Sequence, residues 1–522
     1  MDFLIKISLL IVFFAVMLGV GFYCRKHATD VNGFVLGGRS VGPWLTAFAY
    51  GTSYFSAVVF VGYAGQFGWK YGIAATWTGI ANALLGSLLA WAILGRRTRV
   101  MTQHIGSATM PQFFEKRFMS HSLKITSSTI IFIFLIPYTA SLYNGLSRLF
   151  AMAFHIDYSI CVIVMAILTG VYVIAGGYMA TAINDFIQGI IMIVGIIAVI
   201  AAVLKGQGGF MAALDGLARV SDPAVSDTPG VFASFFGPDP VNLFGVMLLT
   251  SLGTWGLPQM VQKFYAIKSE KSINKGMIIS TLFAVVVAGG CYFLGGFGRL
   301  FSDRVDVAAE GYDAIVPAML SDLPALLIAV VVVLVLSASM STLSSLVLVS
   351  SSTLTLDFLK DLRKGKMEEK QQLFIMRLLI VVFIAISVVL ALVQYRSGVT
   401  FIAQLMGISW GALAGAFLAP FLYGLYWKRT TPAACWCSFL FSVVVMLADI
   451  LRPAMFPAIL RSPINAGAFC MLAGLVLVPV VSLMTKAPEK AKVDQVFSCY
   501  DRKVVVSVRD SIGDEISNEG DM

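Results

Sequence analysis

The sequence contains few charged residues for its length. Only 12% of its 522 residues are Asp, Glu, Lys or Arg, and 58% are hydrophobic. A soluble globular chain carries about 25% charged residues, so the excess of apolar side chains must face lipid. The formal charge of +9 does not indicate nucleic-acid binding, because the basic residues lie in short loops between apolar runs.

Signatures of disulfide bonding, metal binding and common enzyme chemistry are also missing. The seven cysteines show no CxxC pair, zinc spacing or extracellular ladder, so we expect buried, unpaired thiols. The four histidines lie in loops or at helix ends, and no HExxH, GxSxG or P-loop pattern is present. We therefore expect no enzyme, no catalytic residue and no cofactor-binding motif.

Long apolar runs, in contrast, recur along most of the chain. A helix of about 20 residues crosses roughly 30 Å of hydrocarbon at 1.5 Å per residue, and thirteen runs of this kind can be marked off. The predicted fold is an all-α integral membrane protein with thirteen transmembrane helices. They comprise a leading helix in residues 1–24, two sets of five core helices in 42–204 and 241–427, and two additional helices in 432–484, followed by a polar tail in 485–522.

The basic residues orient these predicted helices. With the first residue outside the cell, 27 of the 37 lysines and arginines fall on the cytoplasmic side, Lys263 among them. This asymmetry agrees with the positive-inside rule, and adding or removing one span would invert the downstream loops and spoil it. We predict a multi-pass protein of the plasma (inner) membrane, with its N-terminus outside and its C-terminus in the cytoplasm.

The first helix of each predicted set of five is interrupted. Residues 50–56 (YGTSYFS) place small and polar side chains inside an apolar span, and Pro258 removes a backbone donor at the end of residues 251–258 (SLGTWGLP). Two successive sets of five helices enter the membrane from opposite sides, as in an inverted repeat. Irregular backbone at this depth is tolerated where it lines a cavity. Close packing at Gly and Ser and a tolerated proline kink would explain either break alone.

A stripe of hydroxyl residues is the strongest polar feature of the chain. Residues 337–345 (SASMSTLSS) hold six hydroxyl side chains, and Ala338, Ser341, Thr342 and Ser345 share one helix face at i, i+3, i+4 and i+7. A dehydrated sodium ion takes about five or six oxygen ligands, which hydroxyls and freed carbonyls can supply. Hydrogen bonds to the same helix or to a neighbouring helix are the alternative role.

Asp185 is an acidic residue next to the apolar run 186–204. An ionisable side chain at membrane depth suggests an ion path or a paired charge. A carboxylate near the cytoplasmic end of a helix can instead stabilise the helix N-terminus. Position alone leaves both interpretations open.

These residues together resemble the sodium/solute symporter family over roughly residues 34–434. The resemblance rests on residues 34–40 (FVLGGRS), on residues 176–178 (GGY) followed by Asp185, on residues 340–344 (MSTLS), and on Tyr138 with residues 148–150 (RLF). The last two are similar to the sodium/proline branch. The resemblance implies a leucine-transporter-like five-plus-five inverted repeat and alternating access driven by inward sodium.

The resemblance also implies two sodium sites. The main site transfers onto the backbone carbonyls of Thr52, Phe55 and Ala338 and the hydroxyls of Ser341 and Thr342. A second site, known in the sialic acid branch, would use Asp185 with Ser341, Ser344 and Ser345.

The predicted solute pocket has aromatic walls and few polar groups, which suit a small zwitterion or a monocarboxylate whose carboxylate sits at a half-helix N-terminus. Its expected residues are Ser53, Tyr54, Ser56, Tyr138, Thr254, Trp255 and Pro258.

Departures from the family leave the solute open. The sodium/proline branch has an Asp in place of Tyr54 and a Trp in place of Thr250, and residues 125–147 lack the basic residue with which the sialic acid branch holds its carboxylate. We predict sodium-coupled symport of an amino acid such as proline, with a monocarboxylate, sialic acid or a sugar as alternatives. A membrane sensor and a passive channel are the other classes considered. The expected partners are the solute, sodium and the lipid bilayer, with no nucleic acid, and the protein is expected to function as a monomer.

Overall fold

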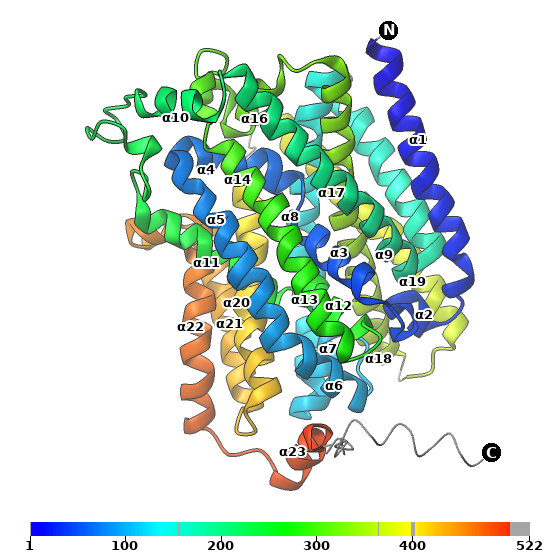
Figure 1. Ribbon diagram of the computed structural model, residues 1–522. Helices are drawn as coiled ribbons and strands as arrows, with labels where there is room; N and C mark the ends of the chain where they lie inside the picture. The colour runs from blue at the N-terminus through cyan, green and yellow to red at the C-terminus, as the bar shows by residue number, and fades with distance from the viewer. Residues whose placement is uncertain (1, 155–156, 364, 398–401, 502–522) are drawn as a thin grey trace, which may run out of the picture.

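The computed structural model describes residues 2–154, 157–363, 365–397 and 402–501, and this part of the chain is helical, without named β-strands. Figure 1 shows an elongated bundle with the start of α1 (Asp2–Tyr23) at one end and α23 (Lys490–Phe497) at the other. Residues 502–522 of the predicted tail, Met1 of the leading helix and Phe401 within the second set of five lie outside the described residues.

The first half of the bundle begins with the short helix α2 (Val31–Leu36) and contains the first set of core helices. The first is α3 (Pro43–Tyr54), which continues after a break through the π-helical segment Val58–Tyr63 into α4 (Ala64–Tyr71). The second is α5 (Thr76–Ala81), which continues through Asn82–Leu89 and Trp91–Gly95 into α6 (Arg96–His104). The other helices of this half are α7 (Met110–Phe118), α8 (His121–Phe154) and α9 (Tyr158–Gly206).

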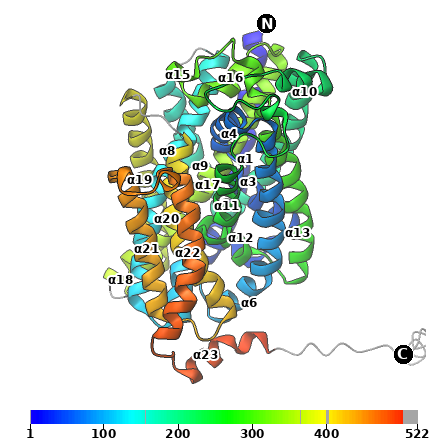
Figure 2. The ribbon, with the colours of Figure 1, turned by 90° about the vertical axis from the view of Figure 1, so that its left-hand side faces the viewer.

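The second half follows the surface helix α10 (Phe210–Ala218). It consists of α11 (Pro240–Gly256), α12 (Pro258–Ala266), α13 (Lys271–Ala284), α14 (Gly290–Gly295), the short helices α15 (Val307–Glu310) and α16 (Ile315–Leu320), α17 (Ala325–Thr353), α18 (Lys360–Leu362), α19 (Glu369–Ser397), α20 (Ile402–Tyr426), α21 (Pro432–Leu451) and α22 (Pro463–Met484). Figure 2 shows α21 and α22 standing together on one side of the bundle, where both pack against α20.

The number of membrane crossings is set by how the long helices are divided. Among the described residues, ten helices are long and apolar enough to span a membrane, or eleven when α11 and α12 count as one bent span. Two of the ten, 58–104 and 158–206, are 47 and 49 residues long. At 1.5 Å per residue each exceeds about 70 Å, more than twice the hydrocarbon thickness. A glycine with positive φ interrupts each one, Gly72 in the first and Gly177 in the second. Thirteen crossings stays a prediction.

The two predicted helix breaks are both present. Helix α3 ends where Phe55 adopts ψ 123°, and α11 ends where Leu257 adopts ψ 125°. Leu257 precedes Pro258, whose ring disfavours the helical conformation in the residue before it, and Pro258 then starts α12 at an angle of 45° to α11. The interrupted helices therefore occur in both halves of the bundle.

Helix α17 forms the centre of the molecule. Every residue from Val331 to Thr353 is buried, as expected for a helix surrounded by others, and α17 contacts α1, α3, α8, α9 and α19. The outer helices expose large apolar side chains instead, such as Ile11 and Phe22 on α1 and Phe374 and Val389 on α19. An apolar belt of this kind is the surface that a bilayer covers.

The cysteines and the tail differ in part from expectation. All seven cysteines are unpaired and six are buried, but Cys437 on α21 is exposed, on the same outward face as Leu440 and Val444. Part of the polar tail is ordered as α23, where Asp494 forms an ion pair with Lys428 at 2.6 Å.

Candidate functional site

The break after α3 brings backbone carbonyls to the hydroxyl stripe of α17. Thr52 and Phe55 lie at the end of α3, where the last carbonyls of a helix have no partner in a following turn. Ser341 and Thr342 face them from α17. The Ser341 hydroxyl lies 3.0 Å from the Thr52 carbonyl oxygen and 3.2 Å from that of Ala338.

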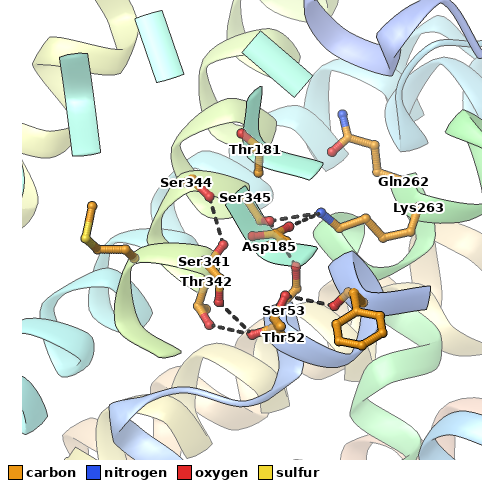
Figure 3. A network of polar contacts seen from close by, with 12 residues as sticks. Thr52, Ser53, Thr181, Asp185, Gln262, Lys263, Ser341, Thr342, Ser344 and Ser345 are labelled. Atoms are coloured by element: carbon orange, nitrogen blue, oxygen red, sulfur yellow. Dashed lines mark hydrogen bonds and ion pairs between the residues drawn. The ribbon is translucent and has the colours of Figure 1, made fainter. Parts of the chain in front are cut away.

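The Thr342 hydroxyl completes this cluster of oxygens. It lies 3.3 Å from the carbonyl oxygens of Thr52 and Phe55 and 3.1 Å from that of Ala338. The five oxygens predicted for the main sodium site therefore lie together, and all five residues are fully buried. Figure 3 shows the hydroxyls of Ser341 and Thr342 directed at Thr52.

The geometry of the cluster is compatible with a monovalent cation as well as with hydrogen bonds between the helices. A hydroxyl has one proton, so the Thr342 side chain serves only one of its three carbonyl neighbours well. Oxygens about 2.4 Å from a common ion are separated by about 3.4 Å when they are neighbours in an octahedron, close to the spacing found. The donor set carries no charge of its own, which suits a singly charged ion.

A second cluster joins three of the predicted solute residues to one that was not predicted. Tyr54 and Tyr138 contact the ring of Trp410 on α20, with ring centroids 5.9 Å and 6.0 Å apart, and Ser56 lies at the break of α3. The four side chains are buried. Within the described part of the chain, Tyr54 Oη, Ser56 Oγ, Tyr138 Oη and Trp410 Nε1 have no partner with good hydrogen-bond geometry. The Tyr138 hydroxyl interacts with Trp410 and Ser56, and that of Tyr54 with Tyr292 and Thr250. Buried polar groups are normally paired, so these four groups are available to a ligand or to water.

Of the remaining predicted solute residues, Thr254 lines a small cavity together with Tyr54, whereas Trp255, Pro258 and Ser53 have other roles. Thr254 donates to the Gly86 carbonyl at 2.8 Å and Trp255 Nε1 to that of Leu85 at 2.9 Å, so both fasten α11 to the neighbouring segment 82–89. Pro258 forms the first turn of α12. Ser53 lies 3.0 Å from Ser345 and belongs to a third cluster.

This third cluster surrounds Asp185 and contains a buried lysine (Figure 3). Lys263 Nζ lies 3.7 Å from Asp185 Oδ2 and donates to Ser345 Oγ at 3.0 Å. Of the other residues predicted for a second sodium site, Ser344 donates back to the Ser341 carbonyl at 2.9 Å, and Ser341 faces Thr52. Asp185 and Ser345 are thus brought together, with a lysine ammonium between them.

Sequence reasoning missed Lys263 and Trp410. Lys263 was counted among the cytoplasmic loop charges, but only 1% of it is exposed. Its signal was a lysine within an apolar span, five residues after the helix-breaking Pro258. Trp410 gave no comparable signal, because one tryptophan among the apolar residues of a span is ordinary.

The two ends of the bundle differ. A large pocket, which we call the vestibule, is lined by segments at the end of the bundle that holds the start of α1, among them Gln66, Arg299, Gln404 and Asn465. Val246, also in its lining, lies one helical turn from Thr250. At the opposite end the chain is closed by Arg39, which donates to the carbonyls of Ser107 at 2.5 Å and Tyr265 at 3.2 Å.

Comparison with known proteins identifies the family of this chain. The sequence profile of the Sodium:solute symporter family matches residues 34–440. The chain belongs to this family. Members of the sodium:solute symporter family are transporters, and sodium is accordingly the coupling ion of this chain, which moves a small solute by symport.

Its similar relatives include three bacterial proteins. It is 29% identical to the osmoregulated proline transporter of Bacillus subtilis, with 92% of this chain and 95% of that protein covered. It is 31% identical to sodium/proline symporter 2 of Staphylococcus saprophyticus, covering 80% and 81%, and 32% identical to the sodium/proline symporter of Staphylococcus aureus, covering 81% of each.

A solved structure shares the fold of this chain. The substrate-bound, outward-open state of a Na+-coupled sialic acid symporter superposes with a TM-score of 0.75 at 17% identity, covering 93% of this chain and 98% of that one. The leucine-transporter-like fold expected from the sequence is thereby confirmed.

Proposed function

We propose that this sodium-coupled symporter carries a small amino acid, with proline as the first candidate, across the plasma membrane. The proposal is supported by the relatives that are named as proline transporters. It is also supported by the cluster of Tyr54, Ser56, Tyr138 and Trp410, which offers aromatic faces and four polar groups in a buried space. A compact ring such as that of proline suits aromatic walls of this kind.

The main sodium ion is proposed to bind the five oxygens of Thr52, Phe55, Ala338, Ser341 and Thr342. Because two of these residues lie on the interrupted α3 and three on α17, the ion ties the broken helix to the centre of the bundle. Tyr54 and Ser56 neighbour Phe55 in sequence. Sodium binding therefore fixes the backbone that also presents the solute pocket, which is a direct physical route to coupling.

Transport is proposed to occur by alternating access, in a monomer surrounded by lipid, with the N-terminus outside and the C-terminus in the cytoplasm. In that orientation the vestibule lined by Gln66, Arg299 and Asn465 faces the exterior, and the closure at Arg39 faces the cytoplasm. The distribution of 27 basic residues on the cytoplasmic side supports this orientation.

A monocarboxylate is the second candidate solute. None of the side chains of Tyr54, Ser56, Tyr138 and Trp410 is a carboxylate that would pair with a substrate ammonium, whereas their hydroxyl and indole donors suit an anionic group.

Uptake into proteoliposomes distinguishes these candidates. With an imposed inward sodium gradient, we expect labelled proline to accumulate. An excess of unlabelled proline should abolish this accumulation, whereas unlabelled short monocarboxylates should not. Preferential competition by a monocarboxylate would favour the second candidate. Uptake of any solute that continues unchanged without sodium would refute symport and indicate a passive channel.

A further inference from the structure

The Asp185 cluster holds a buried ion pair that the main sodium site does not use. Asp185 on α9 is fully buried and Lys263 on α12 is 1% exposed, with 3.7 Å between Nζ and Oδ2. Nζ also donates to Ser345 Oγ, which lies 3.0 Å from Ser53 Oγ, and it lies 5.2 Å from the centre of the Tyr178 ring. The ammonium of α12 therefore contacts α9 and α17, one from each half of the bundle, and Ser345 links it to Ser53 on α3.

The surroundings of this ammonium are those of a small cation site. The Asp185 carboxylate, the Ser345 hydroxyl and the face of Tyr178 surround the ammonium inside the protein, and the Ser53 hydroxyl lies 3.0 Å behind that of Ser345. An ammonium is a compact, single positive charge, so it can occupy a site that an alkali ion would otherwise fill. Among the described residues, both oxygens of Asp185 lack hydrogen bonds, which leaves the ammonium as their main partner.

Charge balance makes a sodium ion and Lys263 alternatives at this site. A buried carboxylate without a partner is strongly unfavourable, and one positive charge neutralises it. A sodium ion beside the ammonium would add a second positive charge within a few ångströms in a poorly solvated space. The site therefore holds either the ammonium or a free cation.

The position of the cluster connects it to the transport cycle. Ser345 follows Ser341 by one helical turn on α17, so the ammonium lies about 6 Å along the helix from the main sodium ligands. Ser53 likewise neighbours Thr52, whose carbonyl belongs to the main sodium site. A cation here would bind to the same two helices as the main sodium ion.

We propose that the Lys263 ammonium is a built-in, covalently tethered cation that fills the Asp185–Ser345 site, so that the protein couples one sodium ion to each solute. A tethered cation is never released, so it takes no energy from the sodium gradient. This inference rests on the proposed sodium-coupled function and replaces the second sodium ion expected from the sequence.

A binding measurement tests the assignment separately from transport. In the purified double variant Ser341→Ala/Thr342→Ala, which lacks the hydroxyls of the main site, we expect sodium not to raise the thermal unfolding temperature. Adding Lys263→Ala to this variant opens the second site, and we expect sodium, but not choline, to restore a saturable stabilisation. A further Asp185→Asn change should remove it again.

Each outcome has a defined meaning. If sodium does not raise the unfolding temperature of the triple variant Ser341→Ala/Thr342→Ala/Lys263→Ala, the proposal of a built-in cation is overturned. A second outcome is that sodium stabilises Ser341→Ala/Thr342→Ala and fails to do so once Asp185→Asn is added. That result would show that sodium binds beside Lys263, and it would also overturn the proposal. If sodium still stabilises the variant after Asp185→Asn is added, the main site is wrongly assigned. Direct binding of ²²Na⁺ then decides the inference: Lys263→Ala should bind one sodium ion more than the wild type.

The coupling ratio gives an independent readout in proteoliposomes. At zero membrane potential and a tenfold sodium gradient, one coupled ion supports about tenfold accumulation and two ions about 100-fold. We expect about tenfold for the wild type and for the exposed-lysine control Lys271→Ala. We expect a higher limit for Lys263→Ala, and about tenfold again for Lys263→Ala/Asp185→Asn, in which both charges are removed and folding is preserved. An accumulation near 100-fold in the wild type would contradict the proposal.

Discussion

Ser341 and Ser344 are neighbouring serines on α17 with different roles. The Ser341 hydroxyl faces the Thr52 carbonyl across the helix interface, whereas the Ser344 hydroxyl donates to the Ser341 carbonyl of its own helix. We expect Ser341→Ala to raise the half-saturating sodium concentration about 10-fold to 100-fold, since a polar contact with a charged group contributes about 1.5–3 kcal/mol.

The matched change Ser344→Ala should alter sodium dependence by less than about threefold, because its hydroxyl bonds to the Ser341 carbonyl of its own helix and interacts with Tyr172, away from the Thr52 carbonyl. Initial rates of solute uptake against sodium concentration measure both variants. Equal effects of the two substitutions would remove Ser341 from the ligand set.

Tyr138 provides a test of the solute pocket. Its buried hydroxyl interacts with Trp410 and Ser56 without good hydrogen-bond geometry, so Tyr138→Phe should leave the folded protein intact but weaken solute binding about tenfold. Tyr172 is a suitable control, because its buried hydroxyl donates to the Met340 carbonyl at 3.0 Å. Tyr172→Phe should lower thermal stability without changing KM for the solute. The reverse pattern would place the solute elsewhere.

For single residues, the sequence predicted which residue types form the sites better than it predicted the directions of their side chains. The positions chosen for the main sodium site do lie together, because the i, i+3, i+4 spacing of α17 fixes one face. The directions of Thr254 and Trp255 depend on the rotation of α11 against the segment 82–89, which no local pattern specifies. Lys263 was misplaced because a charge count by span cannot tell a buried lysine from a loop lysine.

Among the helices, α9 shows how one glycine joins two membrane segments. Gly177 has φ 54° and ψ −145°, a conformation open essentially to glycine alone, and a Cβ there would lie 2.8 Å from the Phe34 carbonyl oxygen. We expect Gly177→Ala to destabilise the protein by about 1–3 kcal/mol through backbone strain and this contact.

The control for Gly177→Ala lies at the end of the same helix. A Cβ on Gly206 would meet no atom within 4 Å, and its φ is not positive. Gly206→Ala should therefore change the thermal unfolding midpoint in detergent by little. If both substitutions lower the midpoint equally, the kink at Gly177 is not the source of the strain.

The helix breaks could be predicted because proline and clustered small residues leave a local signal. Pro258 forces the preceding Leu257 out of the helical region, and the break in α3 falls at Phe55, within the predicted residues 50–56. Residues 176–178 (GGY) gave a similar signal between two apolar runs, and the helical conformation of α9 is indeed interrupted there, at Gly177.

In the molecule as a whole, the two ends of the bundle are in opposite states. The vestibule is open at one end, while Arg39 and a short backbone pairing of Val41 with Ile267 close the other. Burial, followed by the nearby Arg99, lowers the pKa of Arg39 to about 10, which still leaves the guanidinium charged at neutral pH. Its donated hydrogen bonds to the carbonyls of Ser107 and Tyr265 therefore persist over the physiological pH range.

Alternating access requires this closed end to open in each cycle. Val41 and Ile267 face each other in the pairing, with Lys268 N donating to the Val41 carbonyl at 2.9 Å, so cysteines at the two positions are close enough to form a disulfide. In a background without the seven native cysteines, we expect oxidised Val41→Cys/Ile267→Cys to lose more than about 90% of its sodium-driven uptake, as a blocked opening step stops turnover. Sodium and solute should still bind from the vestibule side. Reduction should restore uptake, and each single cysteine variant should be insensitive to oxidant. Full uptake by the crosslinked protein would show that solute leaves by a route that does not separate Val41 from Ile267.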